Sequence, residues 1–149
     1  MIRGYFLARG SRRRPFVDAE ISFPAFGNAS IDVPLLIDTG ADRTVLAPND
    51  ASQLVEQLGI KLAELPEGSP STGVGGRMVT RRIEAIFVLD GLITAPFALT
   101  ILELPRGISL PIPSLLGRDI LSTFALFLEE RTDRVYLLEP HEADAITFP

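Results

Sequence analysis

The sequence predicts an all-β domain with one or two short helices, and three observations support this fold class. In residues 17–23 apolar side chains alternate with polar ones, which is the period of a strand with one buried face. Residues 83–89 and 97–102 are apolar and β-branched, and an Asp-Gly pair and a proline separate them, which is typical of paired strands. Residues 124–128 and 135–138 predict a last hairpin near the C-terminal end. The chain therefore consists mainly of short strands joined by turns.

The composition predicts a single folded domain and excludes several kinds of site. A chain of 149 residues is long enough for one domain, which we expect to span 1–149 with a core at about 16–138 and a tail at 139–149. Cysteine is absent, so disulfides, thiolate catalysis and Cys-based metal sites are excluded. The single histidine, His141, lies in a polar stretch and is expected to be solvated.

The charge pattern argues against nucleic acid and membranes as partners. The net charge is -5, and the basic run at residues 12–14 is short and predicts a solvated loop before the first strand. No window approaches the ~18 apolar residues that a membrane span requires. Residues 1–10 contain too short an apolar segment for a signal peptide. We therefore expect a cytoplasmic protein.

Asp38 is the first candidate catalytic residue, because an apolar strand leads directly to its carboxylate. Residues 31–37 are predicted as that strand, with Pro34 marking a local edge or bulge. Gly40 permits the tight turn that follows, and residues 45–46 return the chain to the core. A carboxylate in this low-dielectric place is costly unless it is hydrogen-bonded or shares a proton with a second acid. By itself, Asp-Thr-Gly is also common in ordinary turns.

One helix is expected at residues 50–58. Asp50 and Gln53 are predicted to form a capping box at its start, and Gly59 is predicted to end it. Its apolar positions are Ala51, Leu54, Val55 and Leu58. We expect this helix to pack over one face of the sheet.

A glycine-rich stretch at residues 71–79 predicts a hairpin. Its tip consists of Gly73, Val74, Gly75 and Gly76. The backbone of such a tip can approach a ligand closely, and an ordinary hairpin turn is the alternative interpretation.

Three segments in this order resemble the motifs of one family. They are Leu-Ile-Asp-Thr-Gly-Ala at 36–41, Gly-Val-Gly-Gly at 73–76 and Leu-Leu-Gly-Arg at 115–118. Together they are similar to the retroviral-type aspartic proteases, the retropepsins and their cellular relatives, over about residues 17–124. The resemblance implies a stand-alone cellular or bacterial member of this retropepsin-like family, with a closed or partly open β-barrel and a glycine-tipped flap.

The resemblance also implies a role for each motif residue. The catalytic turn would consist of Asp38, Thr39 and Gly40. The residues that would contact substrate are Ala41, Asp42, Arg43, Gly73, Val74, Gly75 and Gly76. Leu116 and Gly117 would pack beneath the turn, and Arg118 would hold Asp42 in a bidentate ion pair. No metal and no organic cofactor is implied.

The number of catalytic aspartates in one chain predicts the oligomeric state. An aspartic protease needs two carboxylates that share one proton, whereas this chain has one Asp-Thr-Gly. We therefore expect an aspartic endopeptidase that acts as a homodimer, with Asp38 beside its symmetry mate. Its substrate would be an extended polypeptide, and Arg43 would favour an acidic substrate residue nearby. The alternatives are a dimeric peptide-binding module without turnover and a plain structural β-domain.

The C-terminal end departs from the viral pattern. In the viral enzymes the two chain termini interleave into a dimer sheet. Here the chain continues further, so we expect its end to pair differently or to fold back.

Overall fold

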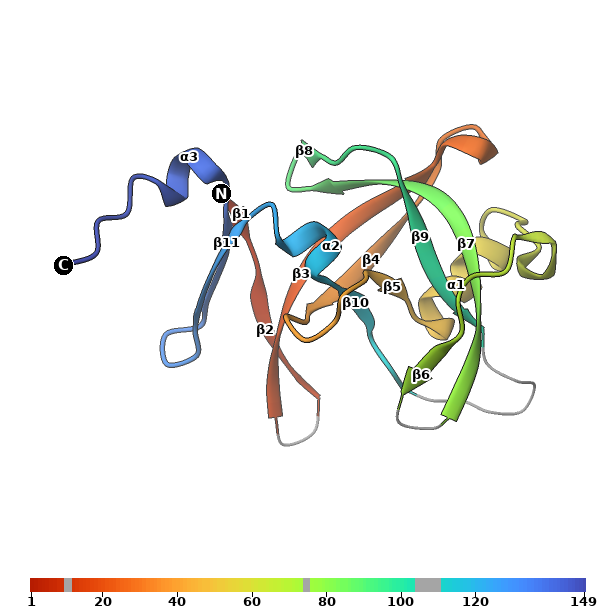
Figure 1. Cartoon of the computed structure of the whole chain (residues 1–149), viewed down its shortest axis with the longest axis horizontal. Coiled ribbons are helices and arrows are strands. Elements are labelled where there is room, and N and C mark those ends of the chain that lie inside the picture. The colour runs from red at the N-terminus through yellow and green to blue at the C-terminus, as the bar shows by residue number, and fades with distance from the viewer. Residues whose placement is uncertain (10–11, 74–75, 104–110) are drawn as a thin grey trace.

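Short strands dominate the structure (Figure 1), a computed structural model that describes residues 1–9, 12–73, 76–103 and 111–149. The strands are β1 (Ile2–Arg3), β2 (Tyr5–Arg9), β3 (Arg12–Phe23), β4 (Ala29–Ile37), β5 (Val45–Leu46), β6 (Ser71–Gly73), β7 (Gly76–Leu89), β8 (Leu92–Ile93), β9 (Phe97–Glu103), β10 (Ser114–Leu116), β11 (Ala125–Glu129) and β12 (Arg134–Leu138). The α-helices are α1 (Pro48–Glu56), α2 (Arg118–Leu121) and α3 (Pro140–Ala143), and 3₁₀ turns lie at Pro24–Phe26 and Leu62–Glu64.

The larger sheet curves round on itself. Its strands follow the order β2-β3-β4-β10-β5-β9-β7-β6, with β8 paired to β7. A further antiparallel pairing joins residues 20–22 of β3 to 86–88 of β7, so β3, β4, β10, β5, β9 and β7 form a closed circuit. The predicted all-β fold class is confirmed, and α3 is one helix more than the sequence predicted.

One cluster of apolar side chains forms the core. Along β3 the alternation predicted for residues 17–23 is confirmed, because Val17, Ala19, Ile21 and Phe23 are all buried. The largest fully buried side chains are Phe16, Phe23, Phe87, Ile21, Leu35, Leu46, Leu54, Ile60, Leu89, Leu99, Ile101 and Leu116. Burying each of them contributes about 1.5–3 kcal/mol, so the core dominates the energy that holds the circuit together.

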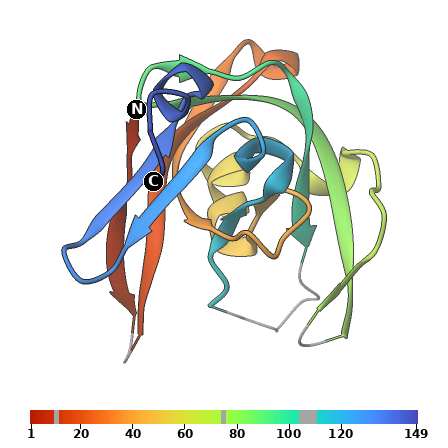
Figure 2. The ribbon, with the colours of Figure 1, turned by 60° about the vertical axis from the view of Figure 1, so that its left-hand side comes forward.

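A smaller sheet stands beside the circuit (Figure 2). Its strand order is β1-β12-β11, and all its pairings are antiparallel. The last hairpin predicted from residues 124–128 and 135–138 is therefore confirmed as β11 and β12. The predicted pairing of residues 83–89 with 97–102 is also confirmed, since Ile83 pairs with Leu99 in the β7–β9 ladder.

The basic run at residues 12–14 is not a loop, so this prediction is wrong. These arginines are the first residues of β3, and β1 and β2 precede them. They are exposed, as expected. They adopt strand structure because β2 supplies a hairpin partner, with Leu7 opposite Arg14 and Ala8 opposite Arg13. The Arg13 guanidinium also lies over the Phe6 ring, 5.3 Å from its centroid.

The predicted start of the first helix is also wrong. The helix begins at Pro48, with Ala47 as its N-cap, and no side chain caps it. Proline is well suited to the first position of a helix, because an amide proton at that position would have no partner within the helix. Asp50 forms no capping box with Gln53, since its carboxylate instead accepts a hydrogen bond from the hydroxyl of Ser114.

The predicted end and buried face of α1 are mostly confirmed. Gly59 has a left-handed φ of 66°, and its amide donates to the carbonyl of Val55. Glycine adopts this conformation at a helix end without strain. Ala51 and Leu54 are buried and Leu58 packs against the core, as predicted. Val55 is 48% exposed, so its predicted burial is wrong.

Two smaller expectations are confirmed. Pro34 lies where β4 has a partner on one side only, because β10 pairs with residues 35–37. Proline has no amide proton, and at this position no hydrogen bond between strands is lost as a result. His141 is exposed, although it belongs to α3 rather than to an irregular tail. In the described part of the chain, no helix is long and apolar enough to cross a membrane.

Candidate active site

Asp38 follows the last residue of β4, a strand that is central at this point. β4 pairs with β3 on one side and, over residues 35–37, in parallel with β10 on the other. The amide of Asp38 continues this ladder by donating to the carbonyl of Leu116 at 3.1 Å. The position of the acid is therefore fixed by two strands from opposite ends of the sequence.

The turn after Asp38 holds its carboxylate. The Gly40 amide donates to Asp38 Oδ1 at 2.9 Å, and the Ala41 amide donates to the Asp38 carbonyl at 3.2 Å. Thr39 and Gly40 are exposed, and Asp38 itself is half-buried. The carboxylate is thus hydrogen-bonded, as the sequence required, but it is less buried in the single chain than we expected.

The segment after β10 clamps the other half of the turn. The Arg118 amide donates to the Ala41 carbonyl at 2.8 Å, and the Asp119 amide donates to the Asp42 carbonyl at 3.2 Å. Arg118 and Asp119 open the short helix α2. These two backbone hydrogen bonds join the second motif to the Asp38 turn.

Gly117 lies directly against the turn, as the resemblance implied. A Cβ at this position would lie 2.3 Å from the carbonyl carbon of Arg43 and 2.8 Å from the Thr44 nitrogen. Both contacts are to backbone, which cannot move aside as a flexible side chain can. Leu116, its neighbour, is fully buried beneath the turn.

The pair of Arg118 and Asp42 forms, but not in the expected geometry. One guanidinium nitrogen lies 2.6 Å from Asp42 Oδ1, so the contact is single rather than bidentate. The Arg118 and Asp42 side chains are 63% and 80% exposed. Water screens a pair this exposed, and its contribution to stability is about 0–1 kcal/mol.

Sequence reasoning missed the pairing of Thr44 with Asp119. The Thr44 amide donates to both carboxylate oxygens of Asp119, at 2.9 and 2.8 Å, and the Thr44 hydroxyl donates to Oδ1 at 2.6 Å. The same hydroxyl accepts from the Gly117 amide at 3.0 Å. Thr44 is buried. The turn is therefore anchored mainly by this pair, in which Thr44 is buried and Asp119 is exposed, and less by the exposed arginine.

A second missed contact ties α1 to β10. The Ser114 hydroxyl donates to Asp50 Oδ2 at 2.5 Å and accepts from the Ala47 amide at 2.8 Å. Ser114 is fully buried. A buried hydroxyl needs such partners, and a serine that opens an apolar strand is the one sequence signal that could have indicated them.

The glycine-rich hairpin is confirmed as β6 and β7, which Figure 1 shows at the lower right. Gly73 pairs with Gly76 at its end, while Val74 and Gly75 lie outside the described residues. The base of this hairpin is held by Arg81, whose Nε lies 2.9 Å from Glu103 Oε2 and whose Nη1 donates to the Leu65 carbonyl at 3.2 Å. A cavity of about 260 Å³ lies beside it, lined by Glu67, Gly68, Pro70, Arg77, Met78, Val79 and Thr80.

The structure unites only some of the predicted site residues. Asp38, Gly40, Ala41, Asp42, Gly117 and Arg118 belong to one hydrogen-bonded unit. Arg43 is exposed next to this unit. The β6–β7 hairpin is a separate element. Among the described residues, no group of three or more His, Asp or Glu side chains is arranged to hold a metal ion.

A closed circuit of strands whose Asp-Thr-Gly turn is held by a distant strand-and-helix segment is the retropepsin-like arrangement. A family model described as aspartyl protease matches residues 25–120, and the chain belongs to this family. The matched residues include both the Asp38 turn and the Arg118 segment.

Two solved structures share the fold. The protease of EIAV, in complex with the inhibitor HBY-793, is 22% identical, with a TM-score of 0.51 over 78% of this chain and 92% of the viral chain. A retropepsin-like aspartic protease from Rickettsia conorii is 19% identical, with a TM-score of 0.58 over 89% of this chain and 96% of its own. No curated protein sequence matches the chain.

Proposed function

We propose that this protein is an aspartic endopeptidase that hydrolyses peptide bonds with a dyad of Asp38 and the partner's Asp38. The observation that carries the proposal is the hydrogen-bonded Asp38 turn. The Gly40 amide fixes one carboxylate oxygen at 2.9 Å, while the side chain stays half-exposed at the end of a rigid strand. Such a carboxylate is oriented and still open to a reactant.

The neighbouring acids support a dyad between two copies. Asp119 is bound to Thr44, Asp50 to Ser114, and Asp42 to Arg118. Each of these carboxylates is engaged in holding the turn or the helix beside it. The second catalytic acid is therefore expected from another copy of the chain, as the single Asp-Thr-Gly predicts.

The proposed reaction uses one shared proton. The ionised Asp38 takes a proton from a water molecule as the water oxygen attacks the scissile carbonyl carbon. The protonated partner's Asp38 donates its proton to the carbonyl oxygen, which forms a tetrahedral intermediate. Asp38 then gives the proton that it took from water to the leaving nitrogen as the C–N bond breaks. The partner's Asp38 takes a proton from a hydroxyl of the intermediate, which forms the product carboxyl group and restores the pair with one shared proton. Thr39 and Gly40 position the acid in this scheme.

The substrate would be an extended polypeptide that lies along the turn. Asp42 and Arg43 form an exposed rim beside Asp38, and the half-buried Ala41 precedes them. The candidates for the opposite wall are the residues of the β6–β7 hairpin, Gly73, Val74, Gly75 and Gly76. An exposed guanidinium on this rim would favour an acidic side chain in the substrate.

The test is digestion of a peptide library, read by mass spectrometry, with wild type and Asp38→Asn. We expect the variant to lose cleavage and keep its melting temperature, because the amide removes the base but not the volume. Asp32→Asn, at an exposed position of the same strand, is the matched control and should cleave as wild type does. Equal cleavage by Asp38→Asn would place the catalytic acid elsewhere. Peptide binding by wild type without cleavage would favour the binding module.

A further inference from the structure

Strand β11 presents an open edge. It pairs with β12 on one side, and no strand in the described part of the chain pairs with the other side. Exposed edges are usually protected by charges, a proline or a bulge. β11 reads Ala-Leu-Phe-Leu-Glu, so its one charge lies at its last residue. An edge this apolar is suited to pairing with another strand.

The apolar face of the smaller sheet is incompletely covered towards this edge. Ile2 on β1 and Val135 and Leu137 on β12 are buried. Leu128 lies directly opposite Val135 on the same face, yet it is 40% exposed. Phe127 on the other face is 39% exposed, although its ring lies 6.0 Å from that of Tyr136. The apolar face is therefore fully buried on β1 and β12 and becomes exposed on β11.

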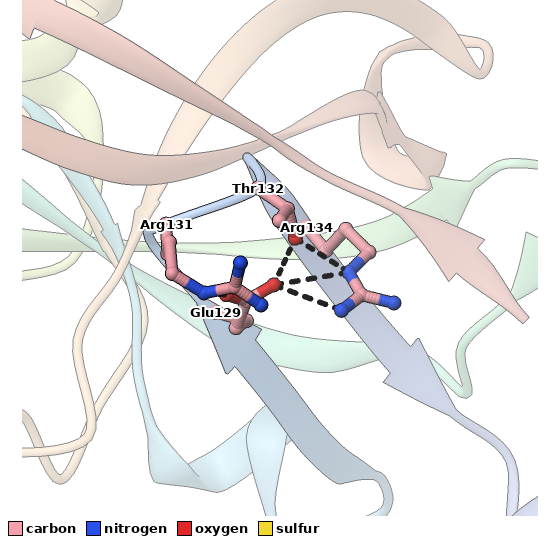
Figure 3. A network of polar contacts seen from close by, with 4 residues as sticks. All are labelled: Glu129, Arg131, Thr132 and Arg134. Carbon is pink, nitrogen blue, oxygen red and sulfur yellow. Dashed lines mark hydrogen bonds and ion pairs between the residues drawn. The ribbon is translucent and has the colours of Figure 1, made fainter.

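The charge at the end of β11 is neutralised within the hairpin, as Figure 3 shows. Glu129 Oε2 lies 2.9 Å from Nη2 of Arg134, Oε1 lies 3.2 Å from Nε of Arg131, and Thr132 donates to Oε2. Glu129 is thus engaged with its own hairpin, and it does not protect the edge as an unpaired charge would.

The N-terminal strand is held by its own chain. Ile2 pairs with Leu137 and Arg3 with Tyr136, and the Gly4 amide donates to the Val135 carbonyl at 2.8 Å. The place that a partner's strand would occupy beside β12 is therefore filled from within the chain. The interleaved termini of the viral pattern do not fit this sheet.

We propose that a second copy of this chain adds its β11 antiparallel to β11, with Phe127 opposite the partner's Phe127. The resulting sheet has the order β1-β12-β11-β11-β12-β1. In this register Leu128 faces the partner's Leu126, which extends the apolar face across the two-fold axis, and Ala125 faces the partner's Glu129, so no like charges oppose each other. The choice of a second copy as occupant rests on the proposed function, because the Asp38 site is incomplete in one chain.

The edge is linked closely to that site. Asp119 and Arg118 clamp the Asp38 turn, and residues 122–124 alone separate their helix, α2, from β11. Residues 122–124 are too few to let α2 move far from β11. Pairing of the two β11 strands therefore sets the position of one Asp38 turn relative to the other. A partner held at this edge contributes its Asp38 to the common site.

The first test is disulfide trapping of Phe127→Cys in an Asp38→Asn background. Directly opposed Cα atoms in an antiparallel pair are about 4.5–5.5 Å apart, which a disulfide spans, and the chain has no other cysteine. We expect the monomer band to be lost on a non-reducing gel after mild oxidation. Ile93→Cys, 69% exposed on β8, is the control for random collision and should stay monomeric. A monomeric Phe127→Cys that keeps its fold by circular dichroism would overturn the proposal.

A second set of variants fixes the register. A mixture of the Leu126→Cys and Leu128→Cys proteins should form more disulfide-linked dimer than either protein alone. In the proposed register, residue 126 of one copy lies opposite residue 128 of the other. A doubled Arg3→Cys and Tyr136→Cys variant should form its disulfide within one chain, and a bond between chains would show interleaved termini instead. Leu128→Arg should shift the sedimenting mass from dimer to monomer, whereas Val55→Arg, at a similarly exposed position of α1, should not.

These outcomes are separable from the proposed activity. Trapping uses the Asp38→Asn background, so it requires no proteolysis. If a cross-linked dimer that retains Asp38 cleaves no peptide, the proposed protease activity would be contradicted and the proposed interface would not. An active protein in which none of the β11 cysteines cross-link would contradict the interface alone.

Discussion

Thr44 and Asp119 lie 75 positions apart in the sequence, and the amide and hydroxyl of Thr44 both donate to the Asp119 carboxylate. This anchor, of which Thr44 is the buried member, joins the Asp38 turn to α2. The exposed pair of Arg118 and Asp42 adds an outer contact to the same two segments. The stability of the site should therefore depend more on Thr44 than on Arg118.

Replacing Thr44 by Val tests this anchor. Valine keeps the shape but removes the hydroxyl. The Gly117 amide then loses this acceptor, and Asp119 Oδ1 loses one donor but keeps the amides of Thr44 and Ile120. We expect a loss of about 1–3 kcal/mol in the free energy of unfolding, measured by urea denaturation. Thr123→Val, at an exposed position whose hydroxyl donates only to the Ile120 carbonyl in the described contacts, is the control and should cost less. Equal losses would show that burial at Thr44 is unimportant.

Gly117→Ala tests the close approach of the two motifs. The new methyl group would lie 2.3 and 2.4 Å from the carbonyl carbon and oxygen of Arg43, so the turn must shift. Overpacking of this kind costs about 1–3 kcal/mol, and a displaced Asp38 should lower kcat as well. Thermal melting and peptide hydrolysis measure the two effects. Unchanged values of both would mean that the turn can move without consequence.

Glu129 gives the hairpin a pH dependence. The hydroxyl of Thr132, with the guanidinium of Arg134, lowers the pKa of Glu129 from its ordinary value of 4.5. A carboxyl whose folded pKa is depressed stabilises the fold above its unfolded pKa, and this contribution is lost as pH falls through the folded pKa. Wild type should therefore melt above Glu129→Gln near neutral pH, and the difference should close as the pH falls below 4.5.

The control for that experiment is Glu56→Gln, at an exposed position of α1. Its melting temperature should follow that of wild type at every pH. A gap between wild type and Glu129→Gln that widened on acidification would reverse the sign of the argument.

Activity should depend on protein concentration, because each chain supplies one Asp-Thr-Gly. We expect the specific activity to fall on dilution, in step with the loss of dimer measured by analytical ultracentrifugation. The catalytic turn of an isolated chain stays folded in this scheme, so circular dichroism should not change over the same range. Full activity in a sedimenting monomer would contradict the shared dyad.

The sequence predicted those parts of the fold that depend on local patterns. The strands β7, β9, β11 and β12 and the turn at Asp38 all follow from alternation, apolar runs and turn residues. β1 and β2 were missed, and the basic residues 12–14 were wrongly predicted as a loop, because strands this short or this basic are stabilised only by the partners that the fold supplies.

The predicted capping box failed for a related reason. Asp50 and Gln53 have the correct local spacing, yet Asp50 turns to Ser114, 64 positions away. A buried hydroxyl on β10 competes for the carboxylate and decides the outcome. The pairing of Thr44 with Asp119 also joins distant parts of the sequence. A local pattern of residue types cannot predict a contact between such distant positions.

The dependence of the Asp38 turn on residues 114–119 also governs when the site can exist during synthesis. Ribosomes release a chain from its N-terminus, and pairings between distant segments form late. A nascent chain that already contains Asp38 has no β10 to pair with residues 35–37 and no Asp119 for Thr44. The Asp38 turn therefore cannot be held in place until most of the chain has been synthesised. If Asp38 acts as proposed, proteolysis would begin only after translation has passed residues 114–119.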